Sequence, residues 1–132
     1  MTNINVKDII NNTIAMSTED GQKLFHVVYE NIKNAHKVKL SFVGIDILIS
    51  HFFNESIGKL YEKFENWDIL DKAIIYEDID EDDLELLQEN VIPTAKNHFK
   101  DSVRIDKIDE SILDPEDFDY EQQEAYEFIF KK

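Results

Sequence analysis

Hydrophobic and polar residues alternate in some segments of the chain and recur every three or four positions in others. Alternation is typical of strands, and it predicts them at residues 4–10, 13–16 and 38–43, while the apolar run 73–76 predicts another. Asn11 and Asn12 lie between the first two strands, so they predict a hairpin there. We expect residues 38–43 to form the central strand, with Val38, Leu40 and Phe42 facing one way.

Amphipathic helices are predicted where apolar residues recur at three- and four-residue spacing. The first follows the polar run 17–20 and reaches about residue 32. The second begins near His51 or Phe52 and ends near Phe64. The third begins at the acidic run 80–83, and Pro93 inside its pattern predicts a kink or two shorter helices. Strands that alternate with such helices predict an α/β fold with a small mixed β-sheet.

The character of the chain changes after about residue 104. Residues 106–127 hold ten acidic residues and one lysine. Asp114 and Pro115 are typical of a helix start, and they predict an amphipathic C-terminal helix over residues 114–130. The predicted organisation is therefore a folded domain at 1–104, followed by an acidic linker and the appended helix at 105–132. The candidate contact residues of that helix are Phe118, Tyr126, Ile129 and Phe130.

Those four residues leave two interpretations of the appended helix. It folds back onto the domain, or it binds a groove on a partner or on a second copy of the chain, which makes a homo-oligomer a candidate assembly. Dense carboxylates could also imitate the phosphates of DNA, an idea that rests on charge alone.

Composition disfavours several classes of function. The 132 residues are 42% hydrophobic, enough for one domain with a real core, and the net charge is −15. Such acidity disfavours direct contact with nucleic acid phosphates and with anionic membranes, but it permits a basic protein partner. The chain has no cysteine, no signal-peptide pattern and no apolar run long enough to span a bilayer. We therefore expect a cytoplasmic protein without a cofactor.

The central segment resembles a known family. The strand ending at Leu40, the pair Gly44-Ile45 and the run from Phe53 to Tyr61 resemble the STAS-like domain family of unknown function, which is related in layout to the STAS domains of bacterial anti-sigma-factor antagonists. The upstream run 17–21 also resembles that family, so the resemblance covers roughly residues 2–100. It implies a sheet with helices packed largely on one face. It further implies a regulatory, protein-binding role in a bacterial signalling switch, beside a kinase-like ATPase.

The resemblance also points to a candidate contact surface at the start of the second helix. In anti-sigma antagonists this turn carries a phosphorylatable serine within an Asp-Ser-Ser/Thr-Gly pattern. Here the run is Ile49-Ser50-His51-Phe52, which lacks the Asp and the Gly, so Ser50 is the one candidate acceptor. A plain helix-capping role for Ser50 is the alternative. The candidate partner-binding residues are Ser50, His51, Asn54, Glu55 and Ser56.

Other polar groups have structural explanations beside functional ones. Thr18, Asp20 and Gly21 form a helix start that could hold an anion, although capping explains them better. Residues 78–83 look like a calcium loop but lack the central glycine and terminal glutamate of an EF-hand. His26, His36, His51 and His98 include no pair at metal-binding helical spacing. Gly58 is expected to allow close packing of its helix against the sheet.

The sequence therefore predicts a regulatory protein-interaction module that is not an enzyme. One alternative is an acidic inhibitor of a nucleic-acid-binding protein. Binding to such a protein that is reduced by competing DNA would indicate this alternative. The other alternative is a structural oligomer with no switch function.

Overall fold

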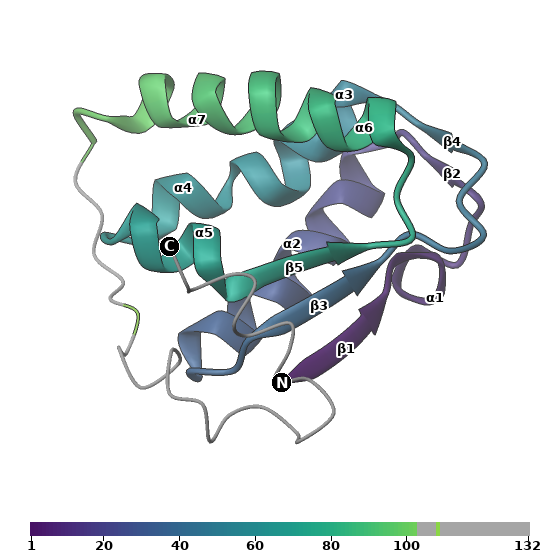
Figure 1. The fold of residues 1–132 in the computed structure, drawn as a ribbon, viewed down its shortest axis with the longest axis horizontal. Coiled ribbons are helices and arrows are strands. Elements are labelled where there is room, and N and C mark those ends of the chain that lie inside the picture. The colour runs from purple at the N-terminus through teal and green to yellow at the C-terminus, as the bar shows by residue number, and fades with distance from the viewer. Residues whose placement is uncertain (103–107, 109–132) are drawn as a thin grey trace.

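A three-stranded parallel sheet forms the centre of the computed structural model, which describes residues 1–102 and residue 108 (Figure 1). Its strands are β1 (Thr2–Asn5), β3 (Val38–Ser41) and β5 (Ile74–Glu77), in the order β1-β3-β5. The central position predicted for residues 38–43 is thus confirmed. In register, Leu40 lies between Ile4 of β1 and Tyr76 of β5.

The predicted hairpin is wrong. β1 is followed by the short helix α1 (Val6–Ile10), and β2 (Ile14–Ala15) pairs in parallel with the distant strand β4 (Ile47–Leu48). Val6 and Ile10 are four residues apart and both are buried, so one helical turn buries them together. Asn11 then ends α1 with a left-handed φ of 52°, a conformation that asparagine tolerates.

The first predicted helix is confirmed as α2 (Thr18–Lys33). Its N-cap is Ser17, whose hydroxyl accepts a hydrogen bond of 3.1 Å from the amide of Asp20. Leu24, Val28 and Ile32 recur every four residues and are fully buried. The polar run at 17–20 therefore acts as a helix start, as its chemistry predicts.

The second predicted helix is a run of three pieces, α3 (Ser50–Phe53), the π-helical turn η1 (Asn54–Gly58) and α4 (Leu60–Lys63). Its predicted apolar stripe is fully or almost fully buried, at Phe53, Ile57, Leu60, Tyr61 and Phe64. The next helix, α5 (Trp67–Ala73), was not predicted. The Asn66 side chain caps it by accepting from the amide of Ile69 at 3.1 Å.

The third predicted helix also contains a π-helical turn. It consists of α6 (Glu81–Leu86), η2 (Leu87–Val91) and α7 (Ile92–Phe99), which Figure 1 shows as one continuous helical ribbon. The helical run is not divided at Pro93 as expected. The π-helical turn η2 lies directly before α7, and Pro93, which cannot donate a backbone hydrogen bond, follows that turn at the start of α7. Leu87, Val91 and Ala95 are buried, as their spacing predicts.

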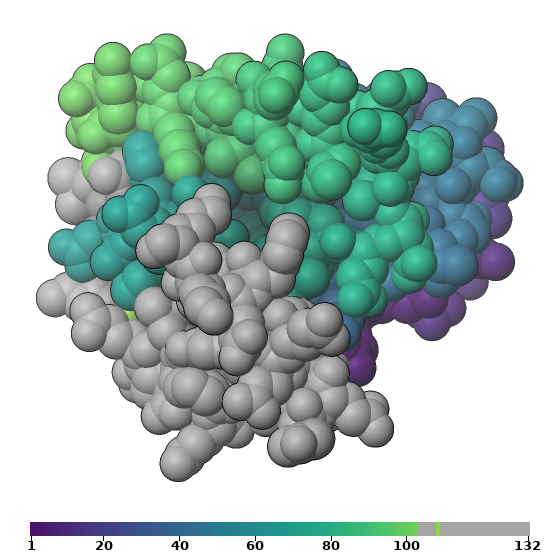
Figure 2. Space-filling model, in the orientation of Figure 1, coloured from purple at the N-terminus to yellow at the C-terminus, as the bar shows by residue number. Residues whose placement is uncertain are grey.

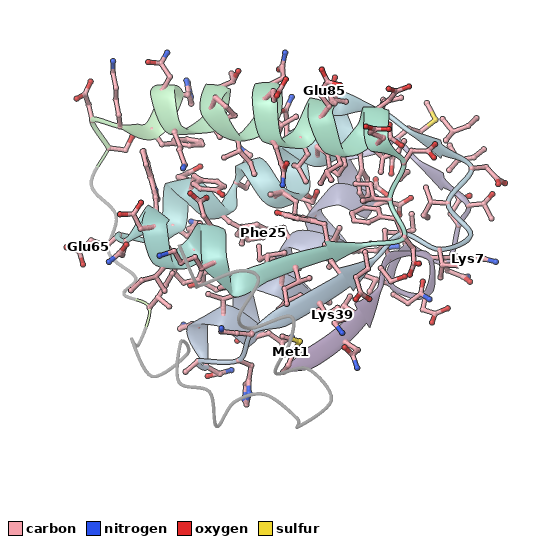
Figure 3. The ribbon with its side chains drawn as sticks, viewed as in Figure 1. Met1, Lys7, Phe25, Lys39, Glu65 and Glu85 are labelled. Carbon is pink, nitrogen blue, oxygen red and sulfur yellow. The ribbon has the colours of Figure 1, made fainter. Side chains whose placement is uncertain are left out.

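The helices lie largely on one side of the three-stranded sheet. In Figure 1 none of the described helices passes in front of the strands, and Lys39 is labelled on that side of the sheet in Figure 3. The covered face carries the buried residues Ile4, Val38, Leu40 and Ile74. The α/β class and the one-sided helical layer are therefore confirmed. The expectation of a mixed sheet is wrong in one respect, because all strand pairs of the described residues are parallel.

Two further predictions concern the C-terminal helix and membrane spans. The helix expected at 114–130, with Phe118, Tyr126, Ile129 and Phe130, lies outside the described residues. Among the described residues, no helix combines the length and the apolar character that a membrane span requires.

Candidate functional site

The start of α3 lies at the end of the second, two-stranded sheet. After β3 the chain turns at Gly44, whose φ of 80° favours glycine, and then forms β4. The amide of Ile49 donates to the carbonyl of Ala15 at 3.2 Å, which extends the pairing of β2 with β4 to the residue just before α3. Ser50 therefore lies beside the chain that leads into α2.

A hydrogen bond joins the starts of α2 and α3. The Oγ1 atom of Thr18 lies 2.6 Å from Nε2 of His51. The backbones are also close, because a Cβ atom added to Gly21 would lie 2.8 Å from Cβ of Glu55 and 3.2 Å from the carbonyl oxygen of Phe52. Gly21 is thus a packing residue, a role that its place in a polar helix start does not reveal.

Gly58 does not have the packing role predicted for it. A Cβ atom there would lie 3.7 Å from the Phe53 carbonyl oxygen and 3.8 Å from Cβ of Ala95, which are ordinary contact distances. These neighbours include α7 and none from the sheet, so the close approach that needs a glycine is at Gly21.

The predicted contact residues divide into an exposed group and a buried one. Ser50, His51 and Asn54 are exposed, and Glu55 is half-buried. Ser50 and Asn54 are four residues apart, as are His51 and Glu55, so each pair is about one helical turn apart. Ser56 is fully buried, and its hydroxyl donates to the Phe52 carbonyl at 2.8 Å. The inclusion of Ser56 in an exposed contact surface is therefore wrong.

The capping interpretation of Ser50 is also wrong. The N-cap position of α3 is Ile49, in an extended conformation, and no side chain caps the helix. Ser50 is the first helical residue, and its hydroxyl is left at the surface. We call the exposed residues Thr18, Ser50, His51 and Asn54, with the half-buried Glu55, the helix-start surface.

Acidic residues gather where the strands of the main sheet end. The Ser41 hydroxyl donates to Oδ2 of Asp78 at 2.7 Å, and Lys39 pairs with Glu77 at 3.3 Å. Burial, with the charges of Asp80 and Asp82, raises the pKa of Asp83 above its usual range. Residues 80–83 form the start of α6, and within the described part of the chain no three His, Cys, Asp or Glu side chains group as metal ligands would.

A network beneath α7 fixes the helices that follow the site. The Tyr61 hydroxyl donates to Oδ1 of Asp71 at 2.5 Å, and Nζ of Lys96 lies 2.6 Å from Oδ2 of the same carboxylate. Burial raises the pKa of Tyr61 and of Tyr76 above the usual tyrosine range, and the charge of Asp71 adds to both shifts. This network joins α4, α5 and α7, so its role is structural.

The remaining histidines give no sign of a shared site. The His98 ring packs edge-on against Phe99, and the His26 ring packs edge-on against Phe25. His36 is exposed, beyond the end of α2. Of the four histidines, His51 is the one that the structure brings to the helix-start surface.

Residues 20–84 match the model of a family described as a STAS-like domain of unknown function. The matched range runs from the first turn of α2 to the first turn of α6, so it contains the resemblance carried by β3 and α3, which is confirmed. The comparison with curated proteins found no match, and neither did the comparison with solved structures.

Proposed function

We propose that this STAS-like domain is a regulatory protein-interaction module whose contact area is the helix-start surface. The observation that carries the proposal is the junction of α2 with α3, where the Thr18–His51 hydrogen bond and the close approach at Gly21 hold two helix starts together. Exposed polar groups held in a fixed geometry suit recognition, because little conformational freedom is lost on binding.

The partner that we propose is a kinase-like ATPase, as the STAS resemblance implies. Ser50 is exposed at the first position of α3, where an attached phosphate would meet the free amides of a helix start. The same phosphate would add negative charge to a surface that already carries Glu55. Phosphorylation would therefore change the charge of the contact surface without changing the fold, which is the behaviour of a switch.

Catalysis by Ser50 and His51 has no support in this geometry. The Nε2 atom of His51 is engaged by Thr18, and Ser50 is its direct neighbour at the start of α3. A nucleophile needs its base within hydrogen-bond reach and correctly aimed. The proposal is therefore of a binding module that is not an enzyme.

Cross-linking in the native host tests the proposal. A photo-reactive amino acid replaces Ser50 in the full chain, and the matched control carries it at Gln88, which is exposed on η2. We expect position 50, but not position 88, to cross-link an ATP-binding kinase-like protein, and His51→Ala to reduce the yield. Mass spectrometry of the unmodified protein reports whether Ser50 carries phosphate.

Two results would contradict the proposal. If position 50 yields no more cross-links than position 88, the helix-start surface is not a contact area. If a basic nucleic-acid-binding protein is cross-linked and DNA competes with it, the chain is an acidic inhibitor, an alternative that its net charge of −15 favours.

A further inference from the structure

An apolar face lies next to the helix-start surface, on the small sheet formed by β2 and β4. Ile14 pairs with Ile47, and Ala15 pairs with Leu48. Successive residues of a strand point to opposite sides, so Ile47 and Ile49 point to the side opposite Leu48, and Ile14 and Met16 to the side opposite Ala15. Ala15 is fully buried, which makes its side the inner one. We call Ile14, Met16, Ile47 and Ile49 the ribbon face.

The ribbon face holds most of the exposed large apolar side chains of the described residues. Met16 is 50% exposed, Ile47 51% and Ile49 37%, and Val43, at 51%, is the fourth residue of this kind. Val43 belongs to another place, because it lines a shallow pocket together with Leu48, on the opposite side of β4. The two small strands lie at one end of the molecule in Figure 1, and that end belongs to the outer surface in Figure 2.

The size of the ribbon face selects the kind of occupant. Four partly exposed aliphatic side chains offer on the order of a few hundred Å² of apolar surface. A stable dimer of folded proteins buries about 800 Å² on each partner. The ribbon face alone is therefore too small to hold two copies of this chain together, but it suits a short segment that inserts a few side chains.

Charge points to the same occupant. Asp46 directly precedes Ile47, and Glu19 lies in the first turn of α2, close in sequence to Met16. Lys7 is the nearby basic residue, packed against Gly44 and pointing outward in Figure 3. Two copies of a chain with net charge −15 repel each other, whereas a basic segment is attracted.

We propose that the ribbon face docks a short segment of the partner protein in which apolar side chains are flanked by lysine or arginine. This inference rests on the proposed function and extends its contact area, because Ile49 directly precedes Ser50. The apolar side chains of the segment pack on Ile47, Ile49 and Met16, and its basic flanks face the acidic residues nearby.

Three synthetic peptides test the docking of such a segment to the full chain. One has an apolar centre with lysine flanks, one has the same centre with glutamate flanks, and one has a serine centre with lysine flanks. The chain has two methionines, Met1 and Met16. In an NMR spectrum of methyl-labelled methionine, the Met16 signal therefore reports binding at the ribbon face. We expect the first peptide to bind and shift the Met16 signal, and the other two to bind much more weakly.

Two serine variants complete the test. Ile47→Ser removes an apolar side chain from the ribbon face, and Val43→Ser removes one of equal exposure from the other side. We expect Ile47→Ser to weaken the first peptide by about tenfold or more, which is the effect of losing a buried Ile. Val43→Ser should leave its affinity nearly unchanged, and circular dichroism confirms that both variants fold.

Several results would overturn the inference. These are equal binding of all three peptides, equal effects of the two variants, or light scattering that shows a dimer which Ile47→Ser dissociates. The failure is separable from that of the proposed function, because cross-linking from position 50 does not depend on peptide binding. Cross-links without peptide binding refute the ribbon face alone, and peptide binding without cross-links refutes the helix-start surface alone.

Discussion

Replacing Gly21 with alanine is the sharpest test of the junction between α2 and α3. The added methyl group would lie 2.8 Å from Cβ of Glu55 and 3.2 Å from the Phe52 carbonyl oxygen. Both atoms belong to or adjoin the helix backbone, so neither can swing aside as the end of a long side chain does. The two helix starts must therefore move apart, and the Thr18–His51 hydrogen bond would be strained or broken.

The net effect follows from two opposing contributions. Overpacking of this kind costs about 1–3 kcal/mol, while alanine in place of glycine within a helix gains about 0.5–1 kcal/mol. We expect Gly21→Ala to lower the free energy of unfolding by about 1–2 kcal/mol. Gly58→Ala is the matched control, because its neighbours lie at 3.7–3.9 Å and neither glycine has a left-handed φ. That variant should gain about 0.4–1 kcal/mol.

Thermal and urea unfolding measure the stability of both variants. The signal is the fluorescence of Trp67, the single tryptophan of the chain. A change of 1 kcal/mol shifts the melting temperature by about 4–8 °C in a domain of this size, so the two variants should separate clearly. A Gly21→Ala protein as stable as the parent would refute the close approach. The same variant should bind partners more weakly, because Glu55 and His51 would be displaced.

Three further predictions concern single groups. Ser17→Ala removes the cap of α2 and should lower the free energy of urea unfolding by about 1 kcal/mol, whereas Ser50→Ala, which removes no cap, should change it by less than about 0.5 kcal/mol. Asp71→Ala removes the acceptor of the Tyr61 hydroxyl and should cost about 1–3 kcal/mol in the same assay; a smaller loss than for Ser50→Ala would contradict the network. Burial raises the pKa of Tyr61 and Tyr76 in the folded chain. The contribution of the two neutral hydroxyls to stability is therefore complete below the unfolded pKa of about 10, and it is lost as the pH rises above that value. Tyrosinate absorbance near pH 11 should therefore increase when urea unfolds the protein, and an unchanged absorbance would refute the burial of these hydroxyls.

Long periodic segments could be predicted from the sequence because their pattern repeats. α2 repeats its apolar stripe at Leu24, Val28 and Ile32, and β3 alternates Val38 and Leu40 with polar residues. Residues 4–10 were misread because Ile4 and Val6 fit a strand while Val6 and Ile10 fit a helix. The pairing of β2 with β4 joins two-residue strands more than thirty positions apart, so local pattern carries no signal for it.

The candidate site was predictable in position and only partly in composition. The strand-then-helix order located Ser50 and His51, but no pattern indicated that Thr18 would meet His51 from another helix. Ser56 was misassigned because a serine near a helix start usually faces water, whereas here its hydroxyl is satisfied by the carbonyl four residues earlier. The exposure of Ile47 and Ile49 had no signal in the sequence, because both lie within an apolar stretch.

The π-helical turn η1 accommodates an extra residue in its helical segment. A π turn holds one residue more than the α-helical turn it replaces, so the residues on either side of it keep nearly the same rotational phase. Deleting one residue from 54–58 would therefore restore a regular helix while Ser50 and His51 keep their direction relative to Leu60 and Tyr61. A deletion in an α-helical turn would instead rotate the two ends by about 100°. The π turn is thus the place where related chains can gain or lose a residue without turning the contact surface away from its partner.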